Sequence, residues 1–272
     1  RNLKRKYMIN CIMASILLLT GCSGGESEGM KINIGRIKVN DFNYEKKFEE
    51  EIEIEECSKI EEICVIVDVG NIDISYDSDD KMKVFAQYNV QTMTQKDMDD
   101  IINLLEIRTV VESDNITFTI APEGIEENAW EWTRQMSKDK INLSVDLHIS
   151  LPKKVNEYKV RVDTGSVTAR NLEGAFKIQT DTGNININNI AINESSCFCT
   201  NTGNIELAIK ENEKMREIDI EVCTDTGNID LDFGGMQYSI TDVKEDATEK
   251  DIEILGKCRV YASTDTGFIS VK

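Results

Sequence analysis

Residues 180–185 read Thr180-Asp181-Thr182-Gly183-Asn184-Ile185, and nearly the same hexapeptide recurs at residues 200–205 and 224–229. Weaker copies surround Gly165 and Gly267. The steps between successive glycines are therefore 18, 20, 24 and 40 residues. A unit of about 20 residues that is used several times is typical of a solenoid, in which each unit forms one coil.

Apolar and polar residues alternate on both sides of the repeated glycine. Ile178 precedes Gly183 by five residues, and Ile185 and Ile187 follow it with the polar Asn186 between them. This period of two predicts a β-strand on each side of a turn in which glycine takes a positive φ. We expect equivalent strands of successive units to pair in parallel, about 4.8 Å apart. The sequence therefore predicts an all-β fold, a parallel β-solenoid or β-helix that the usual crossover rule makes right-handed.

The repeated Asp-Thr-Gly also matches the active-site signature of aspartic proteases, most closely at Val162-Asp163-Thr164-Gly165-Ser166. In those enzymes two aspartates face each other across one cleft. Copies at a short, regular period line up along an axis instead. We therefore interpret the motif as a structural turn.

The first 21 residues have the organisation of a lipoprotein signal peptide. Basic residues precede a short apolar segment from Met8 to Leu19, which is too short to span a membrane. Leu19-Thr20-Gly21-Cys22 resembles the bacterial lipobox, and this resemblance implies cleavage before Cys22 and a lipid on that cysteine. Residues 22–30 would then be the lipidated cysteine and a flexible tether. We expect an extracytoplasmic protein that is lipid-anchored to the bacterial cell membrane.

The chain is strongly acidic, with 50 Asp and Glu against 31 Lys and Arg and a formal net charge of −19. Such a surface repels nucleic acid and anionic membrane surfaces. We therefore expect no nucleic-acid partner, and contact with the membrane only through the lipid anchor.

Residues 31–272 are predicted to be a single β-solenoid domain, with residues 31–120 as its less regular beginning. Helical insertions are expected near residues 94–106, where Thr94 can cap a helix, and near residues 123–138. The second insertion holds Trp130 and Trp132, which are candidate ligand-contact aromatics because paired exposed rings can stack on sugars. More often such aromatics dock an insertion onto the body, and we favour docking.

From about residue 60 onward the chain resembles the bacterial "putative adhesin" family of envelope β-solenoid lipoproteins. The residues that carry the resemblance are Val69-Gly70-Asn71-Ile72-Asp73-Ile74, then Val145-Asp146-Leu147-His148-Ile149-Ser150-Leu151-Pro152-Lys153, and the repeated Thr-x-Thr-Gly-Asn-Ile units. The resemblance implies an envelope β-solenoid whose domain has no settled activity and no catalytic residues to carry over.

Cys199 and Cys223 hold the same repeat position and should be neighbours on adjacent coils. Parallel strands place them within disulfide reach, and an exported protein permits such a bond. A ladder of free thiols is an equal alternative. Cys197 with these two cysteines could also hold zinc, but the sequence shows no fourth ligand and the chain has one histidine. We therefore predict no metal site.

One repeat position is mostly aspartate, and its members should form a row along the stack: Asp163, Asp181, Asn201, Asp225 and Asp265. Neighbouring carboxylates repel, so something must relieve the repulsion. The simplest relief is that each carboxylate accepts turn N–H bonds. The alternative is a calcium ion, although the glycines of known calcium-binding repeats are missing. We expect no cofactor and keep calcium as the lesser possibility.

The sequence contains no GxSxG, P-loop or metalloprotease motif. His148 is the single histidine, and an acidic pair such as Glu206 with Asp230 could imitate a glycosidase site. We predict a non-enzymatic, adhesin-like binding or scaffolding module. The alternatives are a β-helix lyase or hydrolase acting on polysaccharide and a regulatory lipoprotein of the envelope-stress response.

The expected partners are glycan, the cell wall or another envelope protein. The last predicted strand ends near Lys272 without an evident cap. An open edge invites pairing, so we expect either end-to-end self-association or an insertion folded over that end.

Overall fold

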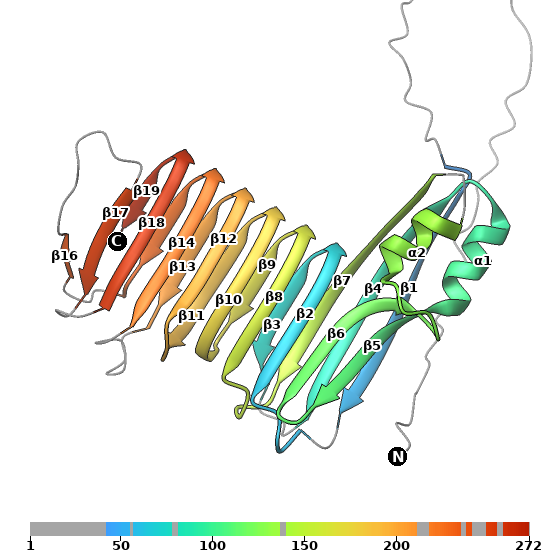
Figure 1. Ribbon diagram of the computed structural model, residues 1–272, viewed down its shortest axis with the longest axis horizontal. Coiled ribbons are helices and arrows are strands. Elements are labelled where there is room, and N and C mark those ends of the chain that lie inside the picture. The colour runs from blue at the N-terminus through green and yellow to red at the C-terminus, as the bar shows by residue number, and fades with distance from the viewer. Residues whose placement is uncertain are drawn as a thin grey trace, which may run out of the picture.

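The computed structural model describes residues 42–54, 57–77, 81–136, 140–210, 218–234, 238–240, 249–254 and 258–271, which form an all-β body with few helices (Figure 1). The signal peptide and tether predicted for residues 1–30, Cys22 included, lie outside the described residues. Two facing sheets make up most of the described body, and most of their strand pairs are parallel. The all-β and mostly parallel predictions are therefore confirmed.

The front sheet in Figure 1 has ten strands among the described residues, in the order β5 (Leu105–Glu112), β6 (Asn115–Pro122), β2 (Glu62–Val69), β8 (Glu157–Thr164), β10 (Glu173–Thr182), β12 (Ser196–Thr202), β14 (Asp219–Thr226), β18 (Cys258–Thr266), β17 (Glu249–Ile254) and β16 (Tyr238–Ile240). The rear sheet has the order β1 (Tyr44–Ile54), β4 (Met82–Thr92), β7 (Ile141–Leu151), β3 (Ile72–Tyr76), β9 (Val167–Arg170), β11 (Ile185–Ile192), β13 (Ile205–Ile209), β15 (Ile229–Asp232) and β19 (Ile269–Val271).

Each coil consists of a front strand, the turn at the repeated glycine and a rear strand. Residues at the same repeat position are paired from coil to coil, for example Ile178 with Phe198 on the front sheet and Ile185 with Ile205 on the rear sheet. The register therefore follows the repeat of the sequence, and one amino-acid position becomes one row along the stack.

The coils do not all stack in chain order. β2 and β3 form the first coil along the chain, but they lie between β6 and β7 on one side and β8 and β9 on the other. The chain thus enters the stack one coil from its end, leaves through β4 and the first helix, and returns to add the outer coil. The sequence predicts residues 31–120 to be the less regular beginning of the solenoid, and it does not show this change of order.

Antiparallel strands flank the parallel coils at both ends of the stack, on both sheets at the N-terminal end and on the front sheet at the other end. At the N-terminal end β5 pairs with β6, β4 pairs with β7, and β1 pairs with β4. At the other end β17 pairs with β18, and β16 pairs with β17. Of the two outcomes expected for the C-terminal end, the structure shows the insertion folded over the edge, on the front sheet. Covering an edge strand in this way removes a site for uncontrolled pairing.

Glycine is required at the turn because the coils approach each other closely there. Gly203 has φ +154°, and a Cβ atom on it would lie 1.9 Å from the carbonyl oxygen of Gly183. Gly183 meets Gly165 in the same way, at 2.0 Å. A side chain at this position would therefore collide with backbone that belongs to the neighbouring coil.

The threonine and asparagine of the repeat link each turn to the next. Thr200 is buried and donates its hydroxyl to the Gly183 carbonyl at 3.0 Å, while Asn204 Oδ1 accepts the Asn228 N–H at 2.8 Å. The threonine bond recurs at Thr180, Thr224 and Thr264. The side-chain bonds form an unbroken ladder through Asp146, Asn71, Ser166, Asn184, Asn204, Asn228 and the N–H of Phe268. The side chains of the motif therefore hydrogen-bond backbone N–H and C=O groups of the turn that would otherwise be left to solvent.

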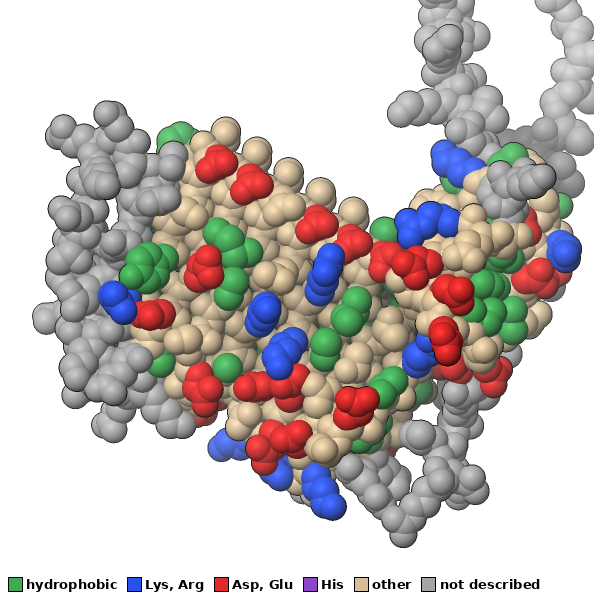
Figure 2. Space-filling model, viewed as in Figure 1, with side chains coloured by type: hydrophobic (Ala, Val, Ile, Leu, Met, Phe, Trp, Pro, Cys, Tyr) green, Lys and Arg blue, Asp and Glu red, His purple; other side chains and the backbone are tan. Residues whose placement is uncertain are grey.

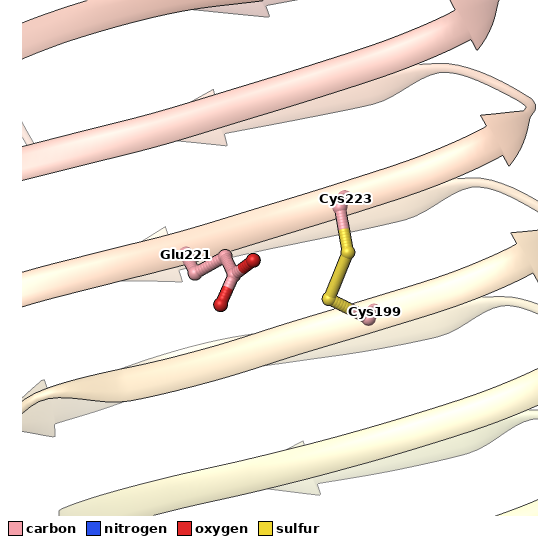
Figure 3. Close-up of side chains that lie close together, drawn as sticks. All are labelled: Cys199, Glu221 and Cys223. Atoms are coloured by element: carbon pink, nitrogen blue, oxygen red, sulfur yellow. A yellow bond between two sulfur atoms is a disulfide. The ribbon is translucent and has the colours of Figure 1, made fainter.

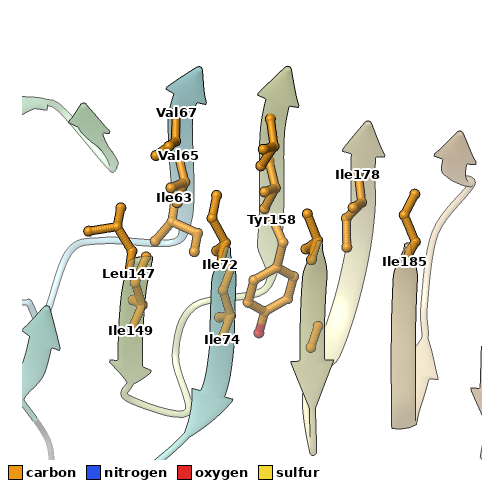
Figure 4. Packing of buried hydrophobic residues seen from close by; sticks show 14 of the residues in the cluster. Ile63, Val65, Val67, Ile72, Ile74, Leu147, Ile149, Tyr158, Ile178 and Ile185 are labelled. Carbon is orange, nitrogen blue, oxygen red and sulfur yellow. The ribbon is translucent and has the colours of Figure 1, made fainter. Parts of the chain in front are cut away.

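The core lies between the two sheets. Inward side chains of β2, β3 and β7 interdigitate there, as Ile63, Ile72 and Leu147 show in Figure 4. Aromatic rings of successive front strands also stack on one another in the core. The ring centroids of Tyr158 and Phe176 are 4.8 Å apart, and those of Phe176 and Phe198 are 5.9 Å apart. Each coil buries its apolar face against its neighbours rather than against itself.

The two helices lie at the N-terminal end of the stack, within the two ranges where insertions were expected. α1 (Gln95–Leu104) begins after Thr94, whose side chain accepts the Asp97 N–H at 3.1 Å, and it packs against β1 and β4. α2 (Ala129–Met136) packs against β6 and β7. Neither these nor any other described helix has the length and apolar character to cross a membrane.

Candidate functional site on the front face

The outward side chains of β2, β8, β10, β12, β14 and β18 define the front face, which Figure 2 shows. Strand register sorts these side chains into three rows along the stack. The aspartate row is Asp68, Asp163, Asp181, Asn201, Asp225 and Asp265. The middle row is Ile66, Arg161, Gln179, Cys199, Cys223 and Ser263, and the lysine row is Cys64, Lys159, Lys177, Cys197, Glu221 and Tyr261. Members of a row are one coil apart, about 4.8 Å, so they interact directly.

The structure brings the five predicted residues of the aspartate row together and adds Asp68, which the sequence analysis missed. Asp181, Asn201 and Asp225 are exposed. Among the described hydrogen bonds, the glycine N–H of a turn goes to a threonine carbonyl of the neighbouring coil, and the N–H of the next residue goes to the side-chain ladder. None of these bonds goes to the carboxylates of the row. This result corrects the expectation that the aspartates accept the turn N–H bonds.

Asp68 is held in an unfavourable electrostatic environment at one end of the aspartate row. Burial raises the pKa of its carboxyl group, and the neighbouring charge of Asp163 raises the pKa further. Arg134 of α2 and Arg161 oppose the shift, whereas Glu131 adds to it. Because the folded pKa lies above the unfolded pKa, the ionised Asp68 lowers stability at neutral pH, and the loss disappears as pH falls through the folded pKa towards the unfolded pKa.

We expect Asp68→Asn to stabilise the protein at pH 7 by less than about 1 kcal/mol, since half-exposed charges are screened. The advantage over the native chain should shrink as pH falls and vanish below about pH 3.9, where an unfolded aspartate is protonated. Melting curves recorded from pH 7 to pH 4 measure this dependence. Asp225→Asn, next to the uncharged Asn201, is the control and should change stability less. An advantage for Asp68→Asn that grows on acidification would contradict the assignment.

Basic side chains occupy the centre of the front face, as Figure 2 shows. Lys159 Nζ lies 2.6 Å from Glu62 and 3.6 Å from Glu157, and Arg161 lies 3.6 Å from Asp163. The two glutamates hydrogen-bond to each other, which lowers the pKa of Glu62 and raises the pKa of Glu157. The front face therefore presents both signs of charge, despite the acidic composition of the chain.

Three cysteines and a glutamate gather on β12 and β14. A disulfide joins Cys199 to Cys223, which are register partners with Cα atoms 4.6 Å apart (Figure 3). The free thiol of Cys197 lies 3.4 Å from Cys199 Sγ, and Glu221 is the register partner of Cys197. Burial and the Glu221 carboxylate raise the pKa of the Cys197 thiol to about 11. Glu221 was not identified from the sequence, because no motif links it to the cysteines.

A pocket of about 560 Å³ opens beside this cluster. Its charged and reactive lining residues are Lys177, Cys197, Asp219, Glu221 and Tyr261, and the rest of the lining is Phe176, Ser195, Ser196, Ala262 and Ser263. The pocket interrupts an otherwise regular face, and it lies where thiol, carboxylate, ammonium and phenol groups meet.

Trp130 does not lie on a binding surface. It is 7% exposed, and its indole N–H donates to the Leu143 carbonyl at 3.0 Å. Trp132 is partly buried against the core. Trp130 therefore docks α2 onto the body, as the favoured interpretation predicts, and it is not a ligand-contact aromatic.

The other residues considered for catalysis lie on the rear sheet. His148 Nδ1 is 3.8 Å from Asp73, which also pairs with Arg170. Glu206 and Asp230 are register partners on β13 and β15, as the repeat predicts. Their positions follow from the regular stacking, and they are on the sheet opposite the pocket.

A family model described as Toastrack DUF4097 matches residues 131–272. The chain is also similar to two solved structures. One is described as a putative cell adhesion protein from Clostridium sporogenes, with 12% identity over 84% of this chain and 99% of that chain and a TM-score of 0.37. The other is described as a putative adhesin from Bacteroides fragilis, with 14% identity over 84% of this chain and 97% of that chain and a TM-score of 0.31. No curated protein matches the chain.

Proposed function

The chain belongs to the Toastrack DUF4097 family, and from this premise we propose that it is a lipid-anchored β-solenoid of the bacterial cell envelope that acts as a non-catalytic binding or scaffolding module. In this proposal the coils follow the right-handed sense that is usual for parallel β crossovers. The stack is a rigid support, and the exposed rows of the front sheet are the contact surface.

The observation that carries the proposal is the repetition of exposed groups at one position per coil. Beside the aspartate row runs a row of exposed threonines, paired from strand to strand: Thr164, Thr182, Thr202, Thr226 and Thr266. A partner that itself repeats, such as a glycan or the wall polymer, can make the same contact on successive coils. Weak contacts of this kind add up through multivalency.

The proposed location rests on the N-terminal segment. The lipobox-like Leu19-Thr20-Gly21-Cys22 supplies the anchor, and residues 23–30 supply a short flexible tether. A protein held in this way works close to the membrane, where it meets the wall and other envelope proteins. The acidic surface, which anionic lipids repel, keeps the body away from the bilayer.

Crosslinking in intact cells of the native organism tests the function. The native chain would be compared with Cys22→Ala and with a row variant carrying Thr182→Lys, Thr202→Lys and Thr226→Lys. A rear-sheet variant with the exposed Asn188→Lys and Glu206→Lys is the matched control. We expect the native chain and the control to capture the same envelope component, and the row variant to lose it.

The captured component distinguishes the forms of the proposal. Membrane proteins captured only by the lipidated chain would support a scaffold, whereas glycan captured with and without the lipid would support an adhesin-like role. Equal capture by the row variant would contradict binding through the front face. Shortened glycan without stable capture would indicate a polysaccharide-active enzyme instead.

The proposal includes no bound calcium in the aspartate row. We therefore expect the same melting temperature in a chelator and in excess calcium, measured by circular dichroism. A calcium ion that bound only the folded chain would raise the melting temperature with concentration. A rise that Asp181→Asn abolishes would place the ion in the row and contradict this part of the proposal.

A further inference from the structure

The cysteine cluster contains a free thiol and a carboxylate in addition to the disulfide. Two pairs of register partners, Cys197 with Glu221 and Cys199 with Cys223, form a square of four side chains on the outward face of β12 and β14. Figure 3 shows the Glu221 carboxylate beside the disulfide, on the same side of the sheet. The cluster therefore combines three sulfur atoms and one carboxylate on two adjacent strands.

The spacing of these atoms is close to that of a tetrahedral metal site. Zinc binds thiolate at about 2.3 Å and carboxylate at about 2.0–2.2 Å, so ligand atoms around one ion lie roughly 3.4–3.8 Å apart. Cys197 Sγ is 3.4 Å from Cys199 Sγ, and the donor atoms of Cys199, Glu221 and Cys223 all lie within 4.8 Å of one another. Three of the four donors therefore already lie close together, and the fourth, Cys197, is adjacent to one of them.

In the oxidised form both Cys199 and Cys223 are committed to the disulfide, which leaves Cys197 and Glu221 as donors. Two donors do not make a closed zinc site, which takes four. Reduction by a dithiol supplies two electrons and two protons, breaks the S–S bond and leaves two thiols, while the dithiol becomes a disulfide. Three thiols and a carboxylate then surround one point.

We propose that reduction of the Cys199–Cys223 disulfide converts this cluster into a zinc site with Cys197, Cys199, Cys223 and Glu221 as ligands. Zinc displaces the three thiol protons into solvent, and the resulting centre carries two net negative charges. Lys177 is the register partner of Cys197 on β10, so its positive charge lies one strand away from the centre. The pocket that Cys197 and Glu221 line gives the ion a path from solvent. The site lies on the front face, but the proposal does not depend on what that face binds.

Cobalt titration of the purified full-length chain tests the site, because Co²⁺ replaces zinc and its absorption reports thiolate ligands and tetrahedral geometry. The chain would be reduced with a phosphine and titrated without oxygen. We expect the reduced chain to bind Co²⁺ with thiolate charge-transfer bands, to release it to Zn²⁺, and to melt at a higher temperature with the metal bound. The oxidised chain should show none of these changes at the cluster.

Two variants assign the ligands. Glu221→Gln keeps the shape of the side chain, and Cys197→Ser leaves the disulfide intact, so both oxidised variants should melt like the native chain. In the reduced state each should bind Co²⁺ at least about 10–100-fold more weakly, since even outer-shell changes have effects of that size. Cys64→Ser removes another cysteine of the lysine row, three coils away, and should change nothing.

Several results would overturn the proposal. One is the absence of thiolate bands in the reduced native chain, and another is unchanged affinity in Glu221→Gln and Cys197→Ser. A third is unfolding of the reduced chain that added metal does not reverse, because a site built on two paired strands must stabilise those strands. Cobalt bound by other cysteines would appear equally in all variants and is thereby recognised.

Discussion

Gly203→Ala should destabilise the protein by about 3–5 kcal/mol, or prevent it from folding. Gly203 has φ +154°, a conformation that L side chains rarely adopt and that costs about 1–3 kcal/mol. The new Cβ would also lie 1.9 Å from the Gly183 oxygen and 2.6 Å from the Gly183 carbon. Backbone atoms cannot rotate away, so the two coils would have to separate. Separation would break the neighbouring Thr200 and Asn204 bonds as well.

Urea denaturation followed by circular dichroism measures this loss. Gly124→Ala is the control, because Gly124 also has a positive φ, +73°, but nothing lies within 4 Å of a Cβ placed on it. Gly124→Ala should lose only about 1–2 kcal/mol of stability, the cost of placing a side chain at a positive φ. Equal losses at the two glycines would show that coil-to-coil contact is not what requires glycine at the turn.

Phe198→Ala should cost about 3–5 kcal/mol, the range for removing a buried phenylalanine ring. Phe198 is fully buried and ends the stack of rings that begins at Tyr158 and continues through Phe176. The small neighbours at its own repeat position, Val222 and Ala262, cannot fill the cavity. Phe198→Leu should recover much of the loss, because a leucine keeps most of the apolar volume.

The same denaturation experiment measures both variants. Phe268→Ala is the control, since Phe268 is 79% exposed, and it should stay within about 0.5 kcal/mol of the native chain. A large loss at Phe268 would mean that its ring is covered in solution. A small loss at Phe198 would mean that the aromatic layer is not part of the cooperative core.

The regular coils were predictable because the repeat is visible one residue at a time. The period of two around Gly183 gives the strands, and the recurrence of the motif gives the register. The match of a family model to residues 131–272 confirms the family resemblance that the motifs indicated. Local sequence therefore determines this part of the chain almost completely.

The N-terminal end was not predictable in the same way. β2 carries the Val69-Gly70-Asn71 turn, but nothing in its sequence shows that β6, about fifty residues later, will take its outer side. That choice depends on α1 and on β5, which pairs with β6 through a tight turn. Alternating apolar residues predict a strand equally well whether its partner is parallel or antiparallel, so the sequence shows the closing strands but not how they pair.

The candidate site was predictable only where it repeats. Spacing identified Asp181 and Asp225 as one row and Cys199 as the neighbour of Cys223. Asp68 escaped because its coil has valine in place of the motif threonine. Glu221 escaped because one glutamate among 50 acidic residues carries no signal until strand register places it opposite Cys197. A functional residue that occurs in one coil only cannot be recognised from the repeat.

The turn ladder makes the length of this protein an adjustable quantity. From the coil of Gly183 to that of Gly267, each coil is joined to the next by the same threonine bond and the same asparagine bond. The antiparallel pairs at the two ends, β5 with β6 and β17 with β18, lie outside this array. A second copy of residues 183–202 inserted after Thr202 would recreate the turn at both junctions. The array would lengthen by one step of about 4.8 Å. The length of the stack can therefore be changed by whole coils without changing the strands at its two ends.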